Sequence, residues 1–253
     1  YIVSYLELVN INKIKLGDKV NFVVPTGNFG NILAGYYAEQ IGLPVNKLIC
    51  ASNNNNVLYD FLKTGVYDKN RDFLKTVSPS MDILISSNLE RLLYYVSGCD
   101  NAYVASLMKD LKETGRFEVT KEILNRIQEK FQTGFADDLD TKETIKKIYE
   151  KDSYLLDTHT AVAYKVLLDN LDKEHANVVL STASPYKFTE SVYTSLNEAT
   201  NEDEFTLMNK LHEQTKVAIP ENLKDLDKKE IRHKDVINKN EMKKYILEKL
   251  GDL

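Results

Sequence analysis

The stretch that decides the fold is KVNFVVPTGNFGNILAGYYAEQ, residues 19–40. It opens with a short run of β-branched and aromatic residues, Val20 to Val24, that ends at Pro25, as expected of a buried parallel strand. A glycine loop, residues 27–31, and a segment rich in alanine and tyrosine follow. The pattern predicts a strand that leads into a helix, with the helix beginning inside the glycine loop.

The glycine loop has the features of an anion cradle. Gly27 and Gly30 lack a Cβ, so the backbone can bend sharply and approach a ligand closely. The N–H groups of a first helical turn have no intrahelical acceptor, and together with the helix dipole they favour an anion such as phosphate. The loop lacks the third glycine of the dinucleotide fingerprint and the lysine of a Walker loop. A tight turn without any ligand also accounts for an isolated G-x-x-G.

Two further apolar runs are candidate strands. Residues 47–50 follow a helix stop at Gly42 and Pro44, and residues 177–181 read NVVLS. A strand, a helix and a second strand in this order form a parallel crossover unit. We therefore predict an α/β fold with an open parallel sheet and flanking helices.

The spacing of apolar residues changes along the chain and divides it into four predicted parts. Residues 1–100 form an α/β portion that holds the glycine loop, and residues 101–156 form a helical insertion with a turn at Gly134. Residues 157–200 return to the α/β sheet. Residues 201–253 form a charged helical tail.

Polar residues precede several predicted helices. Asn53 to Asn56 lie between a strand and a helical pattern, so they cap the helix, face a ligand at the carboxyl end of the sheet, or both. Ser87 and Glu90 have the S-x-x-E spacing of a capping box, and Asp157 is placed to cap the helix after it. We interpret His159 as a local hydrogen-bonding residue rather than a catalyst.

Composition narrows the function classes. The 253 residues are 43% hydrophobic and 28% charged, which suits a globular protein with a sizeable core. The net charge of −5, without a block of one sign, argues against nucleic acid and favours a small-molecule partner. No apolar run is long enough for a membrane span and no signal segment is recognised, so a soluble cytoplasmic protein is expected. Cys50, Cys99 and the four histidines lack metal-ligand spacing, which predicts free thiols and no metal site.

Five segments carry a resemblance to a known family. In order they are PTGNFGN (25–31), ASNNNNVL (51–58), SPSMDILISSNLERLLY (78–94), DTHTAVAY (157–164) and STASPYKF (181–188). With them the chain resembles the carboxy-terminal part of threonine synthase. That family belongs to the pyridoxal phosphate (PLP) enzymes of fold type II, the type of the tryptophan synthase β subunit. The resemblance spans residues 17–188.

The resemblance assigns roles to six residues. It implies that Gly27, Asn28, Phe29, Gly30 and Asn31 hold the phosphate of PLP. It also implies that the Thr182 hydroxyl forms a hydrogen bond with the pyridine nitrogen of the cofactor. The loop of Asn53 to Asn56, called the asparagine loop below, is implied to lie near the substrate. The implied reaction converts O-phospho-L-homoserine and water into L-threonine and phosphate, with PLP as an electron sink.

The resemblance also leaves a role unfilled. In this family the lysine that carries PLP covalently lies upstream of the glycine loop, in a motif that this chain does not contain. We therefore assign no catalytic residue, expect the chain alone to be inactive, and expect its partner to be the missing upstream part of the same enzyme. Two other classes stay open. One is another PLP enzyme of the fold type, such as a serine/threonine dehydratase, and the other is a non-catalytic module that binds a phosphate ligand.

Overall fold

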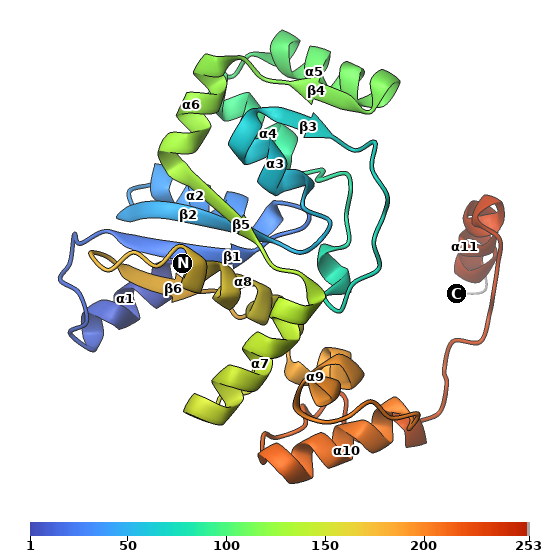
Figure 1. The fold of residues 1–253 in the computed structure, drawn as a ribbon. Helices are drawn as coiled ribbons and strands as arrows, with labels where there is room; N and C mark the ends of the chain where they lie inside the picture. Colours follow the sequence, from blue (N-terminus) through green and yellow to red (C-terminus); the bar gives the residue numbers. More distant parts are fainter. Residues whose placement is uncertain (252–253) are drawn as a thin grey trace. The chain divides into compact units, whose positions relative to one another are not determined.

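A four-stranded parallel sheet forms the centre of the unit that comprises residues 1–218 (Figure 1). The computed structural model describes residues 1–251 and falls into two units, residues 1–218 and 219–253, which are described separately. The sheet belongs to the first unit, with strands in the order β5-β2-β1-β6 and every neighbouring pair parallel. Its strands are β1 (Val20–Pro25), β2 (Val45–Ser52), β5 (Phe131–Phe135) and β6 (Ala176–Val179). The predicted α/β class and the three predicted strands are confirmed.

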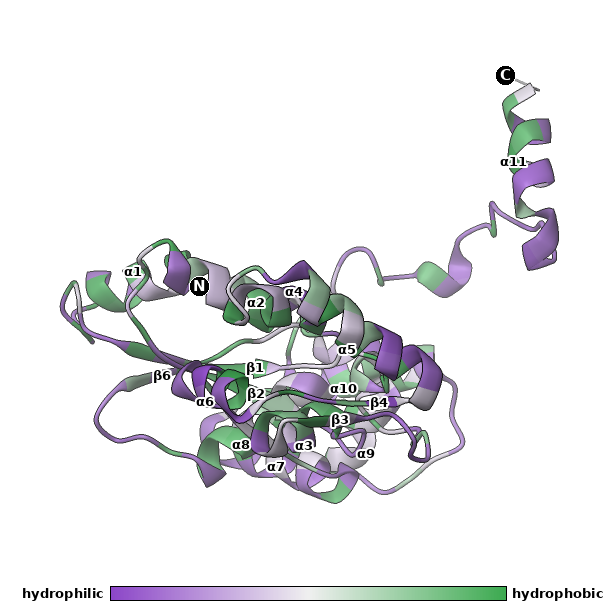
Figure 2. Cartoon of the chain, turned by 90° about the horizontal axis from the view of Figure 1, so that it is seen from above, coloured by the Kyte–Doolittle hydropathy of each residue, from purple (hydrophilic) through white to green (hydrophobic). Residues whose placement is uncertain are grey.

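Helices cover both faces of the sheet. Successive strand side chains point to opposite faces, so Phe22 and Val24 join a core with α2 (Gly30–Gln40), whereas Val23 and Ile49 join a core with α8 (Thr158–Asp169). Figure 2 shows α2 and α8 on opposite sides of β1 and β2. The predicted start of a helix within the glycine loop is confirmed, because α2 begins at Gly30.

The other elements of the first unit surround this centre. They are α1 (Ile2–Asn10), α3 (Val57–Thr64), β3 (Val66–Asp68), η1 (Pro79–Met81), α4 (Leu89–Val96), α5 (Asn101–Thr114), β4 (Arg116–Glu118), α6 (Lys121–Lys130), α7 (Asp138–Asp152), η2 (Pro185–Phe188), α9 (Thr189–Leu196) and α10 (Glu204–Thr215). Strands β3 and β4 form a separate antiparallel pair.

The segment 101–156, predicted as a helical insertion, also contributes to the main sheet. Residues 131–135 form β5, which runs beside β2 with Thr133 opposite Cys50. Gly134 lies inside this strand and not at a turn. A Cβ at Gly134 would lie 2.7 Å from Cγ1 of Val166 in α8, so the glycine lets the helix pack closely on the sheet.

The second unit, residues 219–253, is polar and open in its described part. It contains two short 3-10 turns, η3 (Leu226–Lys228) and η4 (Lys239–Glu241), and the helix α11 (Met242–Gly251). None of these three elements buries a residue. Local bonds hold the helix, for example from the Tyr245 hydroxyl to Asp235 Oδ2 at 2.5 Å.

Candidate anion-binding site

Four loops meet the carboxyl edge of the sheet. Because the strands are parallel, the segments after β1, β2, β5 and β6 all leave at the same edge. Open α/β sheets bind ligands at this edge. The glycine loop follows β1, the asparagine loop follows β2, and Thr182 follows β6. Two sequence-predicted regions that lie about 150 residues apart in the chain, the glycine loop and Thr182, thus leave adjacent strands.

The turn from β1 into α2 is tightly defined. Thr26 continues the strand pairing, since its N–H donates to the Ala51 carbonyl at 2.8 Å. Phe29 then adopts a left-handed backbone with φ of 59°, which is uncommon for a residue with a side chain. Its ring is buried against Phe131, with centroids 5.6 Å apart. Burial of the ring holds the backbone in this conformation, which turns the loop directly into the helix.

The amide groups of the glycine loop are left free to bind a ligand. Within residues 1–251, no protein group accepts a hydrogen bond from the backbone N–H groups of residues 27–31, and no side chain caps the start of α2. These donors, together with the positive end of the helix dipole, favour a phosphate-sized anion. The predicted loop therefore has the backbone arrangement of an anion cradle.

The carbonyl side of the same loop is clamped by residues 86–88. The Ser86 hydroxyl donates to the Gly27 carbonyl at 2.9 Å, and Asn88 Nδ2 donates to the Asn28 carbonyl at 2.7 Å. The Asn28 side-chain oxygen accepts from the Ser87 N–H at 2.6 Å and from the Ser87 hydroxyl at 2.8 Å. With its carbonyls occupied in this way, the loop exposes donors and not acceptors to a ligand.

The capping-box prediction for Ser87 and Glu90 is wrong. The residue at the N-cap of α4 is Asn88, and no side-chain bond caps this helix. Ser87 instead bonds to Asn28, a partner 59 positions away. A pairing of this range has no signal in local sequence spacing, whereas the S-x-x-E spacing of Ser87 and Glu90 is typical of a local cap.

Asn53 and Asn55 do not cap α3 with their side chains. The N-cap residue of α3 is Asn56, without a side-chain cap bond. The amides of Asn53 and Asn55 donate to Asp82 Oδ1 at 2.8 and 2.9 Å, and the Thr76 hydroxyl donates to the same oxygen at 2.7 Å. Asp82 is half-buried and is the hub of a network with the buried side chains of Asn53, Asn55 and Thr76. The network fixes the loop before α4, a role that the sequence did not predict.

His159 links this loop to α8. Asp157 caps α8 as predicted, accepting from the N–H groups of His159 at 2.9 Å and Thr160 at 3.2 Å. Burial of the Asp157 carboxyl opposes its ionisation, but hydrogen bonds from His159 and Thr160 outweigh this effect and lower its pKa. The Ser80 N–H donates to His159 Nε2 at 3.1 Å, so the proton of a neutral ring lies on Nδ1, which faces Asp157 at 3.3 Å. His159 thus acts as a hydrogen-bonding residue, as predicted, but one of its partners, Ser80, lies 79 positions away in the sequence and is not local.

Two hydroxyl groups at the edge lack protein partners. Thr182 is exposed, and its hydroxyl makes no hydrogen bond within the described residues. Ser52 ends β2 beside Thr26 and is 2% exposed, yet its Oγ has no partner in that same part of the chain. A buried polar atom without a partner indicates a ligand or water at that place. Both groups are consistent with a polar ligand at the carboxyl edge.

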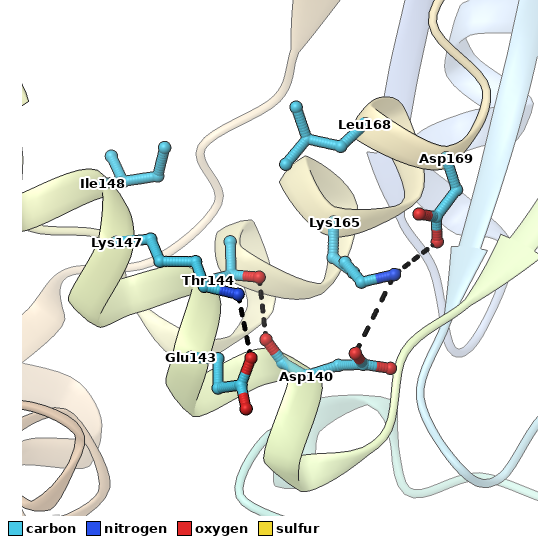
Figure 3. A pocket seen from close by; sticks show the side chains of 8 residues that line it. All are labelled: Asp140, Glu143, Thr144, Lys147, Ile148, Lys165, Leu168 and Asp169. Atoms are coloured by element: carbon cyan, nitrogen blue, oxygen red, sulfur yellow. Dashed lines mark hydrogen bonds and ion pairs between the residues drawn. The ribbon is translucent and has the colours of Figure 1, made fainter. Parts of the chain in front are cut away.

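A pocket elsewhere in the first unit has different chemistry. Asp140, Lys165 and Asp169 line it between α7 and α8 (Figure 3). Lys165 Nζ lies 2.6 Å from Asp169 Oδ2 and 3.8 Å from Asp140 Oδ1. The bond to Asp169 is the main reason that the pKa of Lys165 is raised. The charges in this pocket pair with one another, so the pocket gives no sign of a ligand.

The described residues also lack some features that other functions need. They contain no group of three or more His, Cys, Asp or Glu side chains able to hold a metal ion. Among the helices in this range, none has the length and apolar composition required to cross a membrane.

Comparison with known proteins gives a consistent family. A family model described as "Threonine synthase, C-terminal" matches residues 160–246. Threonine synthase of Saccharomyces cerevisiae is 41% identical over 218 residues, which are 79% of this chain and 42% of that protein. The crystal structure of threonine synthase from yeast matches 99% of this chain and 50% of its own chain, with a TM-score of 0.83 and 37% identity. The chain is related to the carboxy-terminal part of the threonine synthases.

Other relatives agree with this assignment. A PLP-bound threonine synthase from Brucella melitensis has a TM-score of 0.73 and 39% identity, covering 82% of this chain and 45% of its own. Human threonine synthase-like 1 is 40% identical over 195 residues, which are 76% of this chain and 26% of that protein. The chain thus has the fold of the threonine synthases and spans less than half the length of the curated relatives named here.

Proposed function

We propose that the chain acts as the carboxy-terminal portion of a PLP-dependent threonine synthase. The complete enzyme would convert O-phospho-L-homoserine and water into L-threonine and phosphate. The observation that carries the proposal is the set of free N–H groups at residues 27–31, within a chain whose relatives include a PLP-bound threonine synthase.

The residues present fit the cofactor. Gly27, Asn28, Phe29, Gly30 and Asn31 would hold its phosphate through backbone N–H groups, because the loop carbonyls are already bonded to residues 86–88. The Thr182 hydroxyl, exposed at the end of the adjacent strand, would donate to or accept from the pyridine nitrogen. When bound, PLP supplies an electron sink for the removal of protons from the substrate.

Other residues of the chain act by holding these groups in place. The clamp at residues 86–88 fixes the orientation of the glycine loop. The Asp82 network fixes the loop of residues 76–82, and His159 binds that loop at Ser80. A rigid support of this kind keeps the donors of a binding site in their productive positions.

The lysine that carries the cofactor would come from another part of the protein. The motif that contains it in this family is not found in residues 1–253. We therefore propose that the partner of this chain is an upstream part of the same polypeptide, and that residues 1–253 alone do not make threonine. A cytoplasmic location would suit an enzyme of this class.

Loss of PLP from a glycine-loop variant tests the proposal. Within the protein, a Cβ at Gly30 would meet only the Asn88 side chain, with Nδ2 at 3.3 Å. A side chain at residue 30 should therefore disturb a bound phosphate more than it disturbs the fold. In the complete polypeptide, Gly30→Val should lose PLP on gel filtration, as followed by cofactor absorbance. Ala34→Val, an exposed position on the same helix, is the matched control and should retain PLP. Wild-type retention in Gly30→Val would contradict the proposed phosphate site.

A further inference from the structure

Lys187 places a positive charge at the carboxyl edge of the sheet, next to the loop that supports the glycine loop. Its Nζ lies 3.4 Å from the Ser80 hydroxyl. We propose that Lys187 and Ser80 form the binding site for the phosphoryl group of the substrate. This inference rests on the proposed function, and it concerns a different phosphate from the one that the glycine loop would hold.

The position of Ser80 brings this pair close to the cofactor cradle. A Cβ placed on Gly27 would lie 3.2 Å from the Ser80 carbonyl oxygen and 2.9 Å from Met81 Cα. Residues 80 and 81 therefore pack directly on the glycine loop. Lys187 lies five positions after Thr182, in the segment that follows β6. The Lys187–Ser80 contact therefore joins the segment that follows Thr182 to the loop that packs on the glycine loop.

The backbone on the Lys187 side is held firmly. Lys187 lies in η2, where its N–H donates to the Ser184 carbonyl at 3.0 Å and Ser184 Oγ accepts from the Tyr186 N–H at 3.2 Å. Tyr186 is 2% exposed, and its hydroxyl donates to the Val217 carbonyl at 2.5 Å. The ammonium group is thus carried on a fixed turn, and only its own side chain must be ordered on binding.

The backbone on the Ser80 side is fixed by a different contact. The Ser80 N–H donates to His159 Nε2 at 3.1 Å, and the His159 ring packs against Phe188, with centroids 5.1 Å apart. This leaves the Ser80 hydroxyl free to turn toward a ligand. His159 and Phe188 therefore connect the two halves of the proposed site without bonding to the Ser80 hydroxyl or the Lys187 ammonium group.

The charge of Lys187 is not neutralised by the residues that surround it. Within residues 1–251, Nζ contacts the Ser80 hydroxyl and lies 5.3 Å from the centre of the Phe188 ring, and it forms no ion pair with a carboxylate. Lys165, by contrast, is paired with Asp169 at 2.6 Å. An ammonium group binds phosphate as a point charge, and a nearby hydroxyl adds a donor. A phosphate ester with up to two negative charges is the group of the substrate that this pair fits best.

Removal of the charge should weaken binding of phosphate-bearing ligands selectively. In the PLP-loaded complete protein, Lys187→Met should raise KM for O-phospho-L-homoserine by about tenfold or more, as expected for loss of a charge-assisted bond. It should weaken inhibition by inorganic phosphate by a similar factor. Inhibition by threonine, which has no phosphate, and PLP retention should stay unchanged.

Matched variants separate charge from shape. Lys187→Arg keeps the positive charge and should recover most of the affinity for inorganic phosphate. Ser80→Ala removes one neutral donor while keeping the backbone bond to His159, so its effect on KM should be smaller, about two- to tenfold. Lys151→Met, an exposed lysine on α7, is the control and should behave as wild type.

Several results would overturn the inference. The first is an unchanged KM together with unchanged phosphate inhibition in Lys187→Met. The second is an equal loss of threonine inhibition, which would show that Lys187 binds the carboxylate of the amino acid. The third is a loss of PLP from Lys187→Met, which would place Lys187 in the cofactor site. If the wild-type protein makes no threonine, the proposed function fails separately. Calorimetry of inorganic phosphate with PLP-loaded wild type and Lys187→Met then still decides the role of Lys187, since an equal affinity would refute it.

Discussion

Gly27 and Gly30 occupy the same loop but tolerate a side chain to different degrees. A Cβ at Gly27 would lie 2.9 Å from Met81 Cα and 3.2 Å from both the Ser80 carbonyl oxygen and Ile83 Cδ1. Two of these three atoms belong to the backbone of a loop that the Asp82 network holds in place. Favourable carbon contacts are about 3.5–4.0 Å, so the loop would have to move by roughly 0.5–1 Å.

The size of the effect follows from two opposing contributions. Overpacking of this kind costs about 1–3 kcal/mol, whereas replacing glycine by alanine stabilises a protein by about 0.4–1 kcal/mol through the unfolded chain. We therefore expect Gly27→Ala to lower the free energy of unfolding by about 1–2 kcal/mol. At Gly30 a Cβ would lie 3.3 Å from Asn88 Nδ2, which donates to the Asn28 carbonyl. A small shift of this side chain would offset the gain through the unfolded chain, so Gly30→Ala should change the free energy of unfolding by less than about 0.5 kcal/mol.

Urea unfolding of the two variants and the wild type, followed by circular dichroism, measures this difference. With a slope of about 3 kcal/mol per molar urea, Gly27→Ala should lower the midpoint by roughly 0.3–0.7 M. Gly30→Ala serves as the matched control within the same loop. Equal midpoints for Gly27→Ala and Gly30→Ala would refute the argument that the loop of residues 80–83 packs on Gly27.

Three other predictions use different parts of the molecule. Burial raises the pKa of the Cys50 thiol to about 12, so a thiol reagent at pH 8 should label exposed Cys99 in the native protein and Cys50 only after unfolding; early labelling of Cys50 would show that β2 is not buried. A hydrogen bond from Asn21 is the main cause that lowers the pKa of Asp172 to about 2 from 3.8. The contribution of the Asp172 carboxylate to stability is therefore complete above about pH 4 and disappears as the pH falls toward 2. The difference in stability between wild type and Asp172→Asn should shrink over this range, and a difference independent of pH would contradict the assignment. Thr182→Val in the complete enzyme should lower turnover by roughly 2- to 10-fold without changing the melting temperature, and full activity with an unchanged cofactor spectrum would refute the pyridine contact.

The centre of the fold could be predicted because its signals are local. The run from Val20 to Pro25, the glycine loop and the start of α2 are contiguous in sequence, and the residue types there match the conformations they adopt, with the exception of Phe29 and its left-handed backbone. Asp157 likewise caps the helix that immediately follows it. A strand, a helix start and a cap depend on neighbouring residues, so a single sequence carries enough information to place them.

The supports of the candidate site could not be predicted in the same way. Ser87 bonds to Asn28, and Asp82 bonds to Asn53, across 59 and 29 positions of the chain. Their spacing in the sequence fits capping or loop roles equally well. Strand β5 was missed for a related reason, because Gly134 is typical of a turn, and only its packing against Val166 explains a glycine within the strand.

Threonine formation tests the central claim most directly. O-phospho-L-homoserine and PLP are supplied to the 253-residue chain and, in parallel, to the complete polypeptide that joins this chain to its upstream part. Threonine and released phosphate are then quantified. The account predicts equal amounts of threonine and phosphate from the complete polypeptide and no threonine from the chain alone. Threonine from the chain alone would show that it carries its own catalytic lysine, and no threonine from the complete polypeptide would contradict the proposed function.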